Sequence, residues 1–229
     1  MYAKELIRRI NRMCNGNTGR KWPVVPRRKA DHSGINLRAG HVNWWKRLER
    51  TRFYHWSGQR FSPEVFGSQL SELIERVKRQ TGKDGVIYLC IGSDRSTGDS
   101  LGPLVGHQLC RMAPAETLVL GTLRKPVHAV NLTATMELIR RCYSNYLVVA
   151  VDASVGREEN VGGITLGLGS IRPGLGVCKK LQAVGDIYIT GVVHGGNQLE
   201  PELLQSTRLA LVMELAECIS TGISCRKIL

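Results

Sequence analysis

The chain has 229 residues, of which 42% are hydrophobic and 22% are charged, and its net charge is +13. This balance is typical of a globular protein with its own core and excludes a disordered chain. No run of about 18 uncharged apolar residues occurs, which excludes a predicted membrane span, and the N-terminus lacks the apolar stretch of a secretory signal. The seven cysteines are scattered without a CxxC pair. They predict neither a zinc site nor a disulfide framework and favour the reducing cytoplasm.

Almost all of the positive charge lies near the N-terminus. Residues 1–60 hold fifteen Lys and Arg against three acids, whereas residues 61–229 hold seventeen against sixteen. The first segment also holds all four tryptophans. We predict that residues 1–60 form a basic, poorly structured extension and that residues 62–229 form the folded domain. The extension is either a solvated tail or a contact for polyanions. Its tryptophans favour packing on the domain or in a homo-oligomer contact.

Regular periodicity begins at residue 62. Ser62 followed by Pro63 predicts the start of a helix, apolar residues at helical spacing continue it, and Gly82 predicts its end. Downstream, short apolar runs bounded by glycine or acidic residues predict strands that are buried on both faces. The predicted strands are residues 86–92, 117–121, 146–152, 162–169 and 186–193. The helices predicted after the first are residues 99–112, 127–142 and 203–219.

Strands that alternate with helices of ten or more residues predict right-handed βαβ units. The expected fold class is therefore α/β, with three layers in which a mostly parallel sheet carries helices on both faces. In open sheets of this kind, ligands bind beyond the carboxyl ends of the strands. The polar segments that directly follow the strands are therefore the candidate site.

Two of the buried strands are followed by acid-bearing segments. GSDRSTGDSLGP (92–103) follows the first strand and holds Asp94 and Asp99, and DASVGREEN (152–160) begins at Asp152, where the third strand is predicted to end. Taken singly, Asp99 and Asp152 fit helix or turn caps, but together at one sheet edge they predict a carboxylate pair. Such a pair shares a proton and activates a water, or it binds a hard cation, and the spacing does not separate these uses.

Two other interpretations of this region are disfavoured. The segment 92–103 lacks GxGxxG and the Gly-Lys-Ser/Thr ending of a phosphate-binding loop. Residues 98–102 do spell G-x-S-x-G, and Ser100, Asp152 and His194 follow the chain order of a hydrolase triad. Ser100 nevertheless lies eight residues past Gly92, so it lacks the sharp strand–turn–helix setting that such a nucleophile needs.

Basic residues and a histidine follow other predicted strands. His128 comes after the second strand, and residues 169–186 form a glycine-rich basic loop. A loop of this length inside a compact domain is usually functional, although a solvated surface loop remains the alternative. The predicted substrate-binding residues around the aspartates are Asp94, His128, Arg172 and Lys179.

Five long segments of the domain carry a family resemblance. They are IGSDRSTGDSLGPLVG (91–106), GTLRKPVHAVNL (121–132), VAVDASVGR (149–157), IRPGLGVCKKLQAVGDIYITGVV (171–193) and LLQSTRLALVMELA (203–216). Over residues 68–223 the sequence resembles the YyaC family of sporulation proteins, which are described as spore proteases related to the germination protease. The resemblance implies a phosphorylase/hydrolase-like α/β fold, shared more distantly with hydrogenase maturation proteases.

The resemblance also implies a function. In the germination protease two aspartates are proposed to act as an atypical aspartic protease pair, and the matching segments place them at Asp99 and Asp152. Hydrogenase maturation proteases bind nickel at the same two positions with a histidine, but residues 171–174, where it would fall, carry none. The implied protein is an endopeptidase of the forespore or spore core with no metal or cofactor, and small acid-soluble spore proteins are its candidate substrates. The alternative is a non-catalytic binding or regulatory spore protein on the same scaffold.

Overall fold

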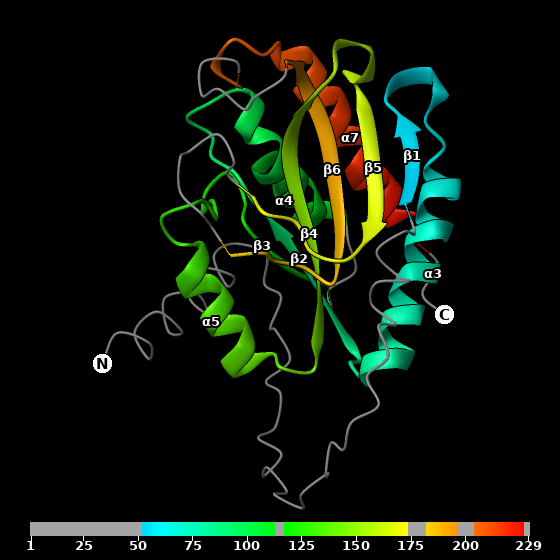
Figure 1. Ribbon diagram of the computed structural model, residues 1–229, viewed down its shortest axis with the longest axis vertical. Coiled ribbons are helices and arrows are strands. Elements are labelled where there is room, and N and C mark those ends of the chain that lie inside the picture. The colour runs from blue at the N-terminus through cyan, green and yellow to red at the C-terminus, as the bar shows by residue number, and fades with distance from the viewer. Residues whose placement is uncertain (1–51, 113–116, 174–181, 197–203, 227–229) are drawn as a thin grey trace, which may run out of the picture.

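The computed structural model describes residues 52–112, 117–173, 182–196 and 204–226. These residues form one mixed sheet flanked by helices (Figure 1). The strands are β1 (Arg52–Trp56), β2 (Gly85–Cys90), β3 (Leu118–Leu120), β4 (Tyr146–Gly156), β5 (Gly163–Leu168) and β6 (Ile187–Gly195). The helices are α3 (Pro63–Thr81), α4 (Leu101–Met112), α5 (Leu132–Cys142) and α7 (Leu209–Ser224), and three short 3-10 turns are η1 (Gly58–Arg60), η2 (Gly98–Ser100) and η3 (Glu158–Asn160).

The six strands lie in the order β1-β5-β6-β4-β2-β3. β3, β2, β4 and β6 run parallel to their neighbours among these four, as βαβ units require, whereas β5 is antiparallel to β6 and β1 is antiparallel to β5. The predicted α/β architecture, with a sheet between helices, is therefore confirmed. The antiparallel part of the sheet is confined to β5 and the edge strand β1.

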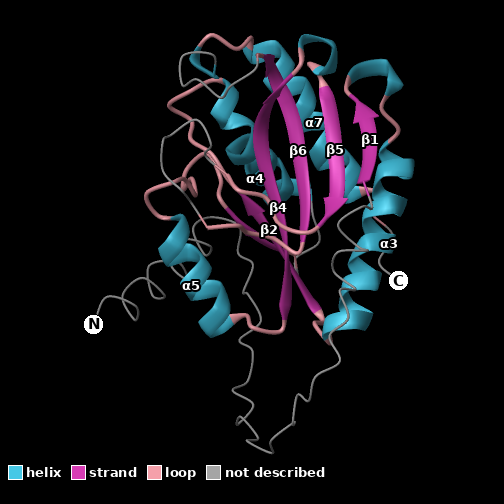
Figure 2. Ribbon diagram, viewed as in Figure 1, coloured by secondary structure: helices cyan, strands magenta, loops and turns pink. Residues whose placement is uncertain are grey.

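The sheet has a separate apolar core on each face. Alternation along β2 directs Tyr88 and Cys90 into the core that contains α3, α4 and α7, and it directs Ile87 and Leu89 into the core under α5. Figure 2 shows α4 and α7 behind the strands, α3 to the right of them and α5 to the left. The central strands are continuously apolar because helices cover both of their faces. None of the described helices has the length and apolar character needed to cross a membrane.

The first predicted helix is observed where the sequence places it. The Ser62 hydroxyl caps α3 by accepting a hydrogen bond from the Val65 N–H at 3.3 Å, Pro63 occupies the first turn, and Gly82 ends the helix in the left-handed conformation. The later helices are shifted toward the C-terminus: α5 begins at Leu132 and α7 extends from Leu209 to Ser224. Sequence periodicity alone did not locate these boundaries.

The predicted end of the closing helix at residue 219 is wrong, because α7 continues through Gly222 to Ser224. Gly222 lies inside α7, and a Cβ atom there would come within 2.5 Å of the Phe66 ring on α3. The absence of a side chain thus lets α3 and α7 approach closely. From the sequence alone, a glycine in the last turns of an apolar helix predicts the end of that helix. Its role in the close packing of α3 against α7 can be recognised only from the tertiary structure.

The predicted end of the third strand at Asp152 is also wrong. β4 continues to Gly156 and stays paired with β6, with a register shift between Ser154 and Val155. Asp152 interrupts the run of apolar side chains but not the hydrogen bonding of the backbone. The aspartate therefore lies within a strand, and its side chain has the fixed direction that the pleat imposes.

The structure differs from the expected boundary at residue 60, because residues 52–60 form β1 and η1. β1 pairs with β5 from Arg52↔Gly167 to Trp56↔Gly163, and Phe53 packs against the main core. Three of the five side chains of this short strand are exposed, so it carries too weak an apolar signal to be recognised. Residues 1–51 and their tryptophans lie outside the described residues.

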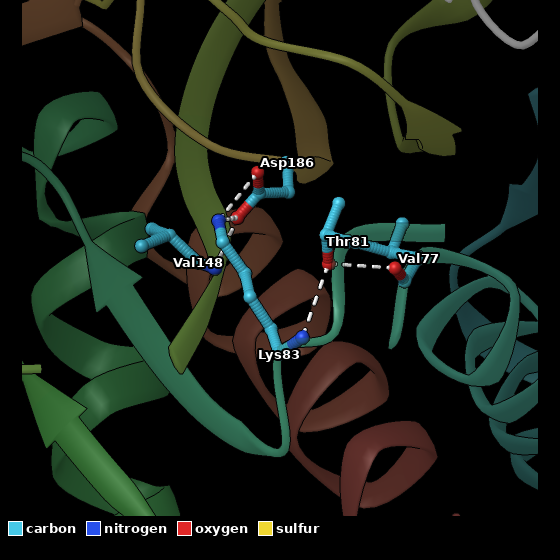
Figure 3. Close-up of polar contacts among 5 residues, drawn as sticks. All are labelled: Val77, Thr81, Lys83, Val148 and Asp186. Atoms are coloured by element: carbon cyan, nitrogen blue, oxygen red, sulfur yellow. Dashed lines mark hydrogen bonds and ion pairs between the residues drawn. The ribbon is translucent and has the colours of Figure 1, made fainter. Parts of the chain in front are cut away.

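An ion pair at the amino-terminal ends of the parallel strands joins the start of β2 to the start of β6 (Figure 3). The Lys83 ammonium donates to both carboxylate oxygens of Asp186, at 2.9 and 2.8 Å, and the Asp186 carboxylate also accepts the Val148 N–H of β4 at 2.8 Å. The Thr81 hydroxyl, which donates to the Val77 carbonyl at 2.7 Å, holds the preceding turn. The pair therefore fixes where three elements enter the sheet.

Replacing Asp186 by Ala is expected to lower the free energy of unfolding by about 2 kcal/mol. The replacement leaves the partly buried Lys83 ammonium and the Val148 N–H of β4 without their hydrogen-bond acceptor. Urea unfolding followed by circular dichroism measures this change. The matched control is Glu75→Ala, which breaks the helix-surface pair with Lys78 at 3.4 Å and should cost less than about 0.5 kcal/mol. Equal effects of the two replacements would contradict the structural role of Asp186.

Candidate active site

The segment between β2 and α4 folds back on itself and brings Asp99 to the end of β2. Gly92 has a φ of 137°, and a Cβ atom there would overlap the carbonyl oxygen of Asp99. The Ser93 N–H donates to that same carbonyl at 3.2 Å. Gly102, on the first turn of α4, likewise lies against the Ile91 backbone with no room for a side chain. These glycines serve close backbone packing and not phosphate binding.

Asp152 lies on the adjacent strand β4, directly opposite Thr190 of β6. It is 7% exposed, and its carboxylate accepts the Ala153 N–H at 3.0 Å. Because Ala150, two residues earlier, belongs to the core under α5, the pleat directs Asp152 to that same side of the sheet. The turn η2, which carries Asp99, contacts β4. The fold therefore brings the two aspartates into one region beyond the carboxyl end of β2, beside the middle of β4.

The two carboxyl groups affect each other electrostatically. Burial raises the pKa of Asp152 well above its ordinary value, the charge of Asp99 raises it further, and the hydrogen bond from Ala153 opposes the shift. Burial also raises the pKa of Asp99, against a hydrogen bond from the Ser93 backbone and the nearby imidazole of His128. Both shifts favour a pair that retains a proton where isolated aspartates would be ionised.

His128 is the third titratable group of this region. It is half-buried in the turn between β3 and α5, where its backbone N–H donates to the Asn131 side-chain oxygen at 2.8 Å. The ring Nδ1 accepts the Val130 N–H at 3.3 Å. In the neutral ring the proton therefore resides on Nε2. The Gly92 N–H donates to the Val127 carbonyl at 2.8 Å, so the histidine turn lies beside the segment that leads to Asp99.

Not all of the other residues predicted from the sequence lie with Asp99, Asp152 and His128. Asp94 and Arg172 are exposed, and Lys179 lies outside the described residues. Ser100 is buried, and its hydroxyl donates to the Thr97 carbonyl at 2.6 Å, so it is not poised as a nucleophile. His194 is engaged at Nδ1 with the Gly195 carbonyl at 2.6 Å. Within the described ranges, no three His, Cys, Asp or Glu side chains are arranged to hold a metal ion.

Sequence reasoning missed a hollow beside Asp152. A cavity of about 460 Å³ is lined by residues of β1, β5 and β6, among them Thr190, the neighbour of Asp152. Its lining is mainly hydroxyl, aromatic and glycine residues, which carry no catalytic signature in the sequence. The signal that could have revealed it is the alternation of polar side chains along β5 and β6, whose other face is apolar.

Comparison with known proteins places this fold and site in a family. Residues 62–222 match the family model described as "Protein of unknown function (DUF1256)". The chain belongs to this family. The DUF1256 match therefore covers the elements from α3 to β6, all but the last two residues of α7, and both aspartates. Over 156 residues the chain is 43% identical to "Uncharacterized protein YyaC" of Bacillus subtilis, which covers 68% of this chain and 76% of that protein. The predicted resemblance to the YyaC family is thus confirmed.

One solved structure that is similar to the DUF1256 chain is the [NiFe] hydrogenase maturation protease HycI from Thermococcus kodakarensis. The two are 17% identical with a TM-score of 0.35, and the match covers 68% of this chain and 99% of HycI.

The buried aspartate makes the stability of the DUF1256 domain depend on pH. Because the pKa of Asp152 is raised by folding, the native state binds more protons than the unfolded state above the unfolded value of about 3.9, and stability falls as pH rises from there toward the folded pKa. Replacing Asp152 by Asn is expected to stabilise the protein by at least about 1 kcal/mol at pH 7. Below about pH 4 this gain should vanish.

Urea unfolding at pH 7 and at pH 3.5 measures this difference. The control is Asp94→Asn, which changes an exposed carboxylate of the neighbouring loop and should leave stability within about 0.5 kcal/mol at both values. A loss of stability in Asp152→Asn at pH 7 would mean that the ionised carboxylate helps to hold the fold.

Proposed function

We propose that this protein is a peptidase in which Asp99 and Asp152 share one proton and activate a water. The observation that supports this most is the pKa of Asp152, which burial and the charge of Asp99 both raise. Asp186, the other strand-associated aspartate, has a lysine partner, but no Lys or Arg of the described residues forms a salt bridge with Asp152. A buried carboxyl group without a cation is costly to the fold and typical of an acid–base site.

The unequal environments of the two carboxyl groups suggest their roles. Asp152 is the more deeply buried group, so it holds the shared proton, and Asp99 is the ionised partner. Asp99 takes a proton from the attacking water, whose oxygen bonds to the peptide carbonyl carbon, while Asp152 gives its proton to the carbonyl oxygen. The resulting diol returns a proton to Asp152 as the C–N bond breaks, and Asp99 gives its proton to the leaving amine.

His128 has a positioning role in this proposal. In its imidazolium form the positive charge of the ring opposes the rise in the Asp99 pKa, which keeps Asp99 the more acidic member of the pair. The backbone N–H of His128 donates to the Asn131 side chain and the Val130 N–H donates to the ring Nδ1, so the neutral ring carries its proton on Nε2.

The biological setting rests on the family resemblance. We propose that the peptidase acts in sporulation or germination, in the forespore or spore core, and that small acid-soluble spore proteins are its substrates. The test is to incubate the purified protein with an acid extract of spores and to identify new termini by mass spectrometry. Wild type and Glu75→Gln, a change on the surface of α3, should give the same fragments, and Asp99→Asn and Asp152→Asn should give none.

Identical behaviour of all four proteins would overturn the peptidase proposal. Retention of spore proteins by the variants without cleavage by wild type would instead favour the alternative, a binding or regulatory protein on the same scaffold.

The basic N-terminal segment is a separate functional region in this proposal. Removing residues 1–51 is expected to leave the thermal unfolding temperature within about 2 °C while weakening heparin or DNA binding, because most of the positive charge lies there. Removing residues 1–60 should lower the unfolding temperature by several degrees, since it deletes β1 and the contact of Phe53 with the core. Equal stability of the two shortened proteins would contradict the role of β1.

A further inference from the structure

Among the described helices, none covers one half of the sheet on the side that Asp152 faces. The core under α5 is built from β2, β3, β4 and the loops around them, and it contains no residue of β1, β5 or β6. Figure 1 shows β6, β5 and β1 in front of α7, with α5 well to one side. Among the described elements, the outer face of these three strands is therefore open.

The pairing of the strands connects this open face to Asp152. Residues directly opposite each other on neighbouring strands project to the same side of a sheet. One such row contains Tyr54 of β1, Thr165 of β5, Thr190 of β6 and Asp152 of β4. Three strand spacings of about 4.8 Å separate its ends, so Tyr54 lies about 14 Å from Asp152.

The next row of paired residues on the same face contains Arg52, Gly167 and Tyr188. Arg52 and Tyr188 line the cavity described above, together with Tyr54, Thr165 and Thr190 of the first row. A Cβ atom at Gly167 would lie 2.5 Å from Tyr188 Cζ, so the tyrosine ring lies across the glycine. Burial raises the pKa of Tyr188, and the charge of Arg52 and its hydrogen bond to the Tyr188 hydroxyl oppose this rise. Arg52 is exposed, and its guanidinium is thus held beside Tyr188 at the cavity wall.

The charge of the cavity is positive. Arg52 is its one ionised group, and its other lining residues are hydroxyl, aromatic, aliphatic or glycine residues. No carboxylate of the described residues forms a salt bridge with Arg52. An uncompensated arginine in a concave site is suited to a carboxylate, which it can bind through two parallel hydrogen bonds. The hydroxyls of Thr165 and Thr190 can bond to the backbone of an extended peptide.

We propose that this groove, formed by the outer faces of β1, β5 and β6, binds an acidic stretch of the polypeptide substrate. Arg52 lies two residues from Tyr54 along β1, which places it about 16 Å from Asp152. An extended peptide advances about 3.4 Å per residue, so the acidic residue that meets Arg52 lies about five residues from the bond that reaches Asp152. This inference rests on the peptidase function proposed above, and it adds the location and charge of the substrate subsite.

The test measures binding in the full-length Asp152→Asn protein, which cannot cleave its ligand. Two fluorescein-labelled ten-residue peptides differ only in a central Asp-Glu-Asp-Glu or Asn-Gln-Asn-Gln, and fluorescence anisotropy gives their affinities. The acidic peptide is expected to bind at least about tenfold more tightly. Arg52→Gln should remove this preference, and Arg79→Gln, on the solvent-exposed side of α3, should retain it.

A second variant keeps the test independent of Arg52. Thr165→Glu adds a negative charge inside the groove and should abolish binding of the acidic peptide, while its circular dichroism spectrum stays that of wild type. Equal affinity for the two peptides, or a preference that survives Arg52→Gln, would overturn the proposal. A dimer that forms through this face and excludes the peptide would overturn it as well.

The result is separable from the peptidase proposal. If wild type cleaves spore proteins and Arg52→Gln leaves KM unchanged, the groove is not the subsite although the peptidase function stands. If the acidic peptide binds through Arg52 and wild type cleaves nothing, the groove is a binding site and the peptidase function fails.

Discussion

Replacing Asp152 by Asn is expected to lower kcat/KM for peptide hydrolysis by about 1000-fold, because asparagine cannot give a proton to the carbonyl oxygen and take it back. The structural change is small, since the amide occupies the same space and can still accept the Ala153 N–H. A fluorogenic peptide that contains the cleaved bond, identified from the spore-protein fragments, measures the effect. The loss of activity should accompany the gain in stability at pH 7 derived above, which excludes unfolding as its cause.

The pH profile gives an independent check on the shared proton. Activity requires one proton on the pair, so it should fall at low pH when Asp99 is protonated and at high pH when Asp152 loses its proton. Because burial and the charge of Asp99 raise the pKa of Asp152, the high-pH limb should lie well above the range of an ordinary aspartate. A profile that stays flat from pH 4 to pH 9 would contradict proton sharing.

The second large effect is expected at Gly92. Gly92→Ala should lower the free energy of unfolding by about 3 kcal/mol or more, because the new methyl group would overlap the Asp99 carbonyl oxygen and the φ of 137° is unfavourable for alanine. The change would also displace Asp99 from Asp152, so the surviving folded protein should have lost its activity.

Gly82→Ala is the matched control for this change. Gly82 also has a positive φ, of 70°, but nothing lies within 4 Å of the position its Cβ would occupy. Its replacement should cost about 1 kcal/mol, the strain of the backbone alone. Chemical unfolding of both variants separates strain from overlap, and equal costs would mean that the loop after β2 has room to move.

The stability of this domain and its candidate chemistry oppose each other at Asp152. The surrounding strands bury the carboxyl group and provide the Ala153 N–H as a hydrogen-bond donor. A well-packed apolar residue would suit the fold better, whereas the raised pKa that burial produces suits a group that exchanges protons near neutral pH. The burial of Asp152 within β4 thus lowers the stability of the fold and at the same time raises the pKa that the proposed chemistry needs.

The sequence by itself determined the α/β architecture, because long apolar runs and helical periodicity report burial on one or both faces directly. It also singled out Asp99 and Asp152, since an acid next to a buried strand contradicts the pattern around it. The start of α3 followed from Ser62 and Pro63, whose effects on the backbone are local.

Only the tertiary structure decided the features that depend on residues distant in the chain. The placement of β1 at the edge of the sheet depends on its pairing with β5, and the extension of β4 past Asp152 depends on hydrogen bonds to β6. The helical position of Gly222 reflects a contact with Phe66 on another helix. The row of residues that joins Tyr54 to Asp152 spans four strands. Strand register and close packing bring together residues far apart in sequence, so no local pattern of residue types encodes them.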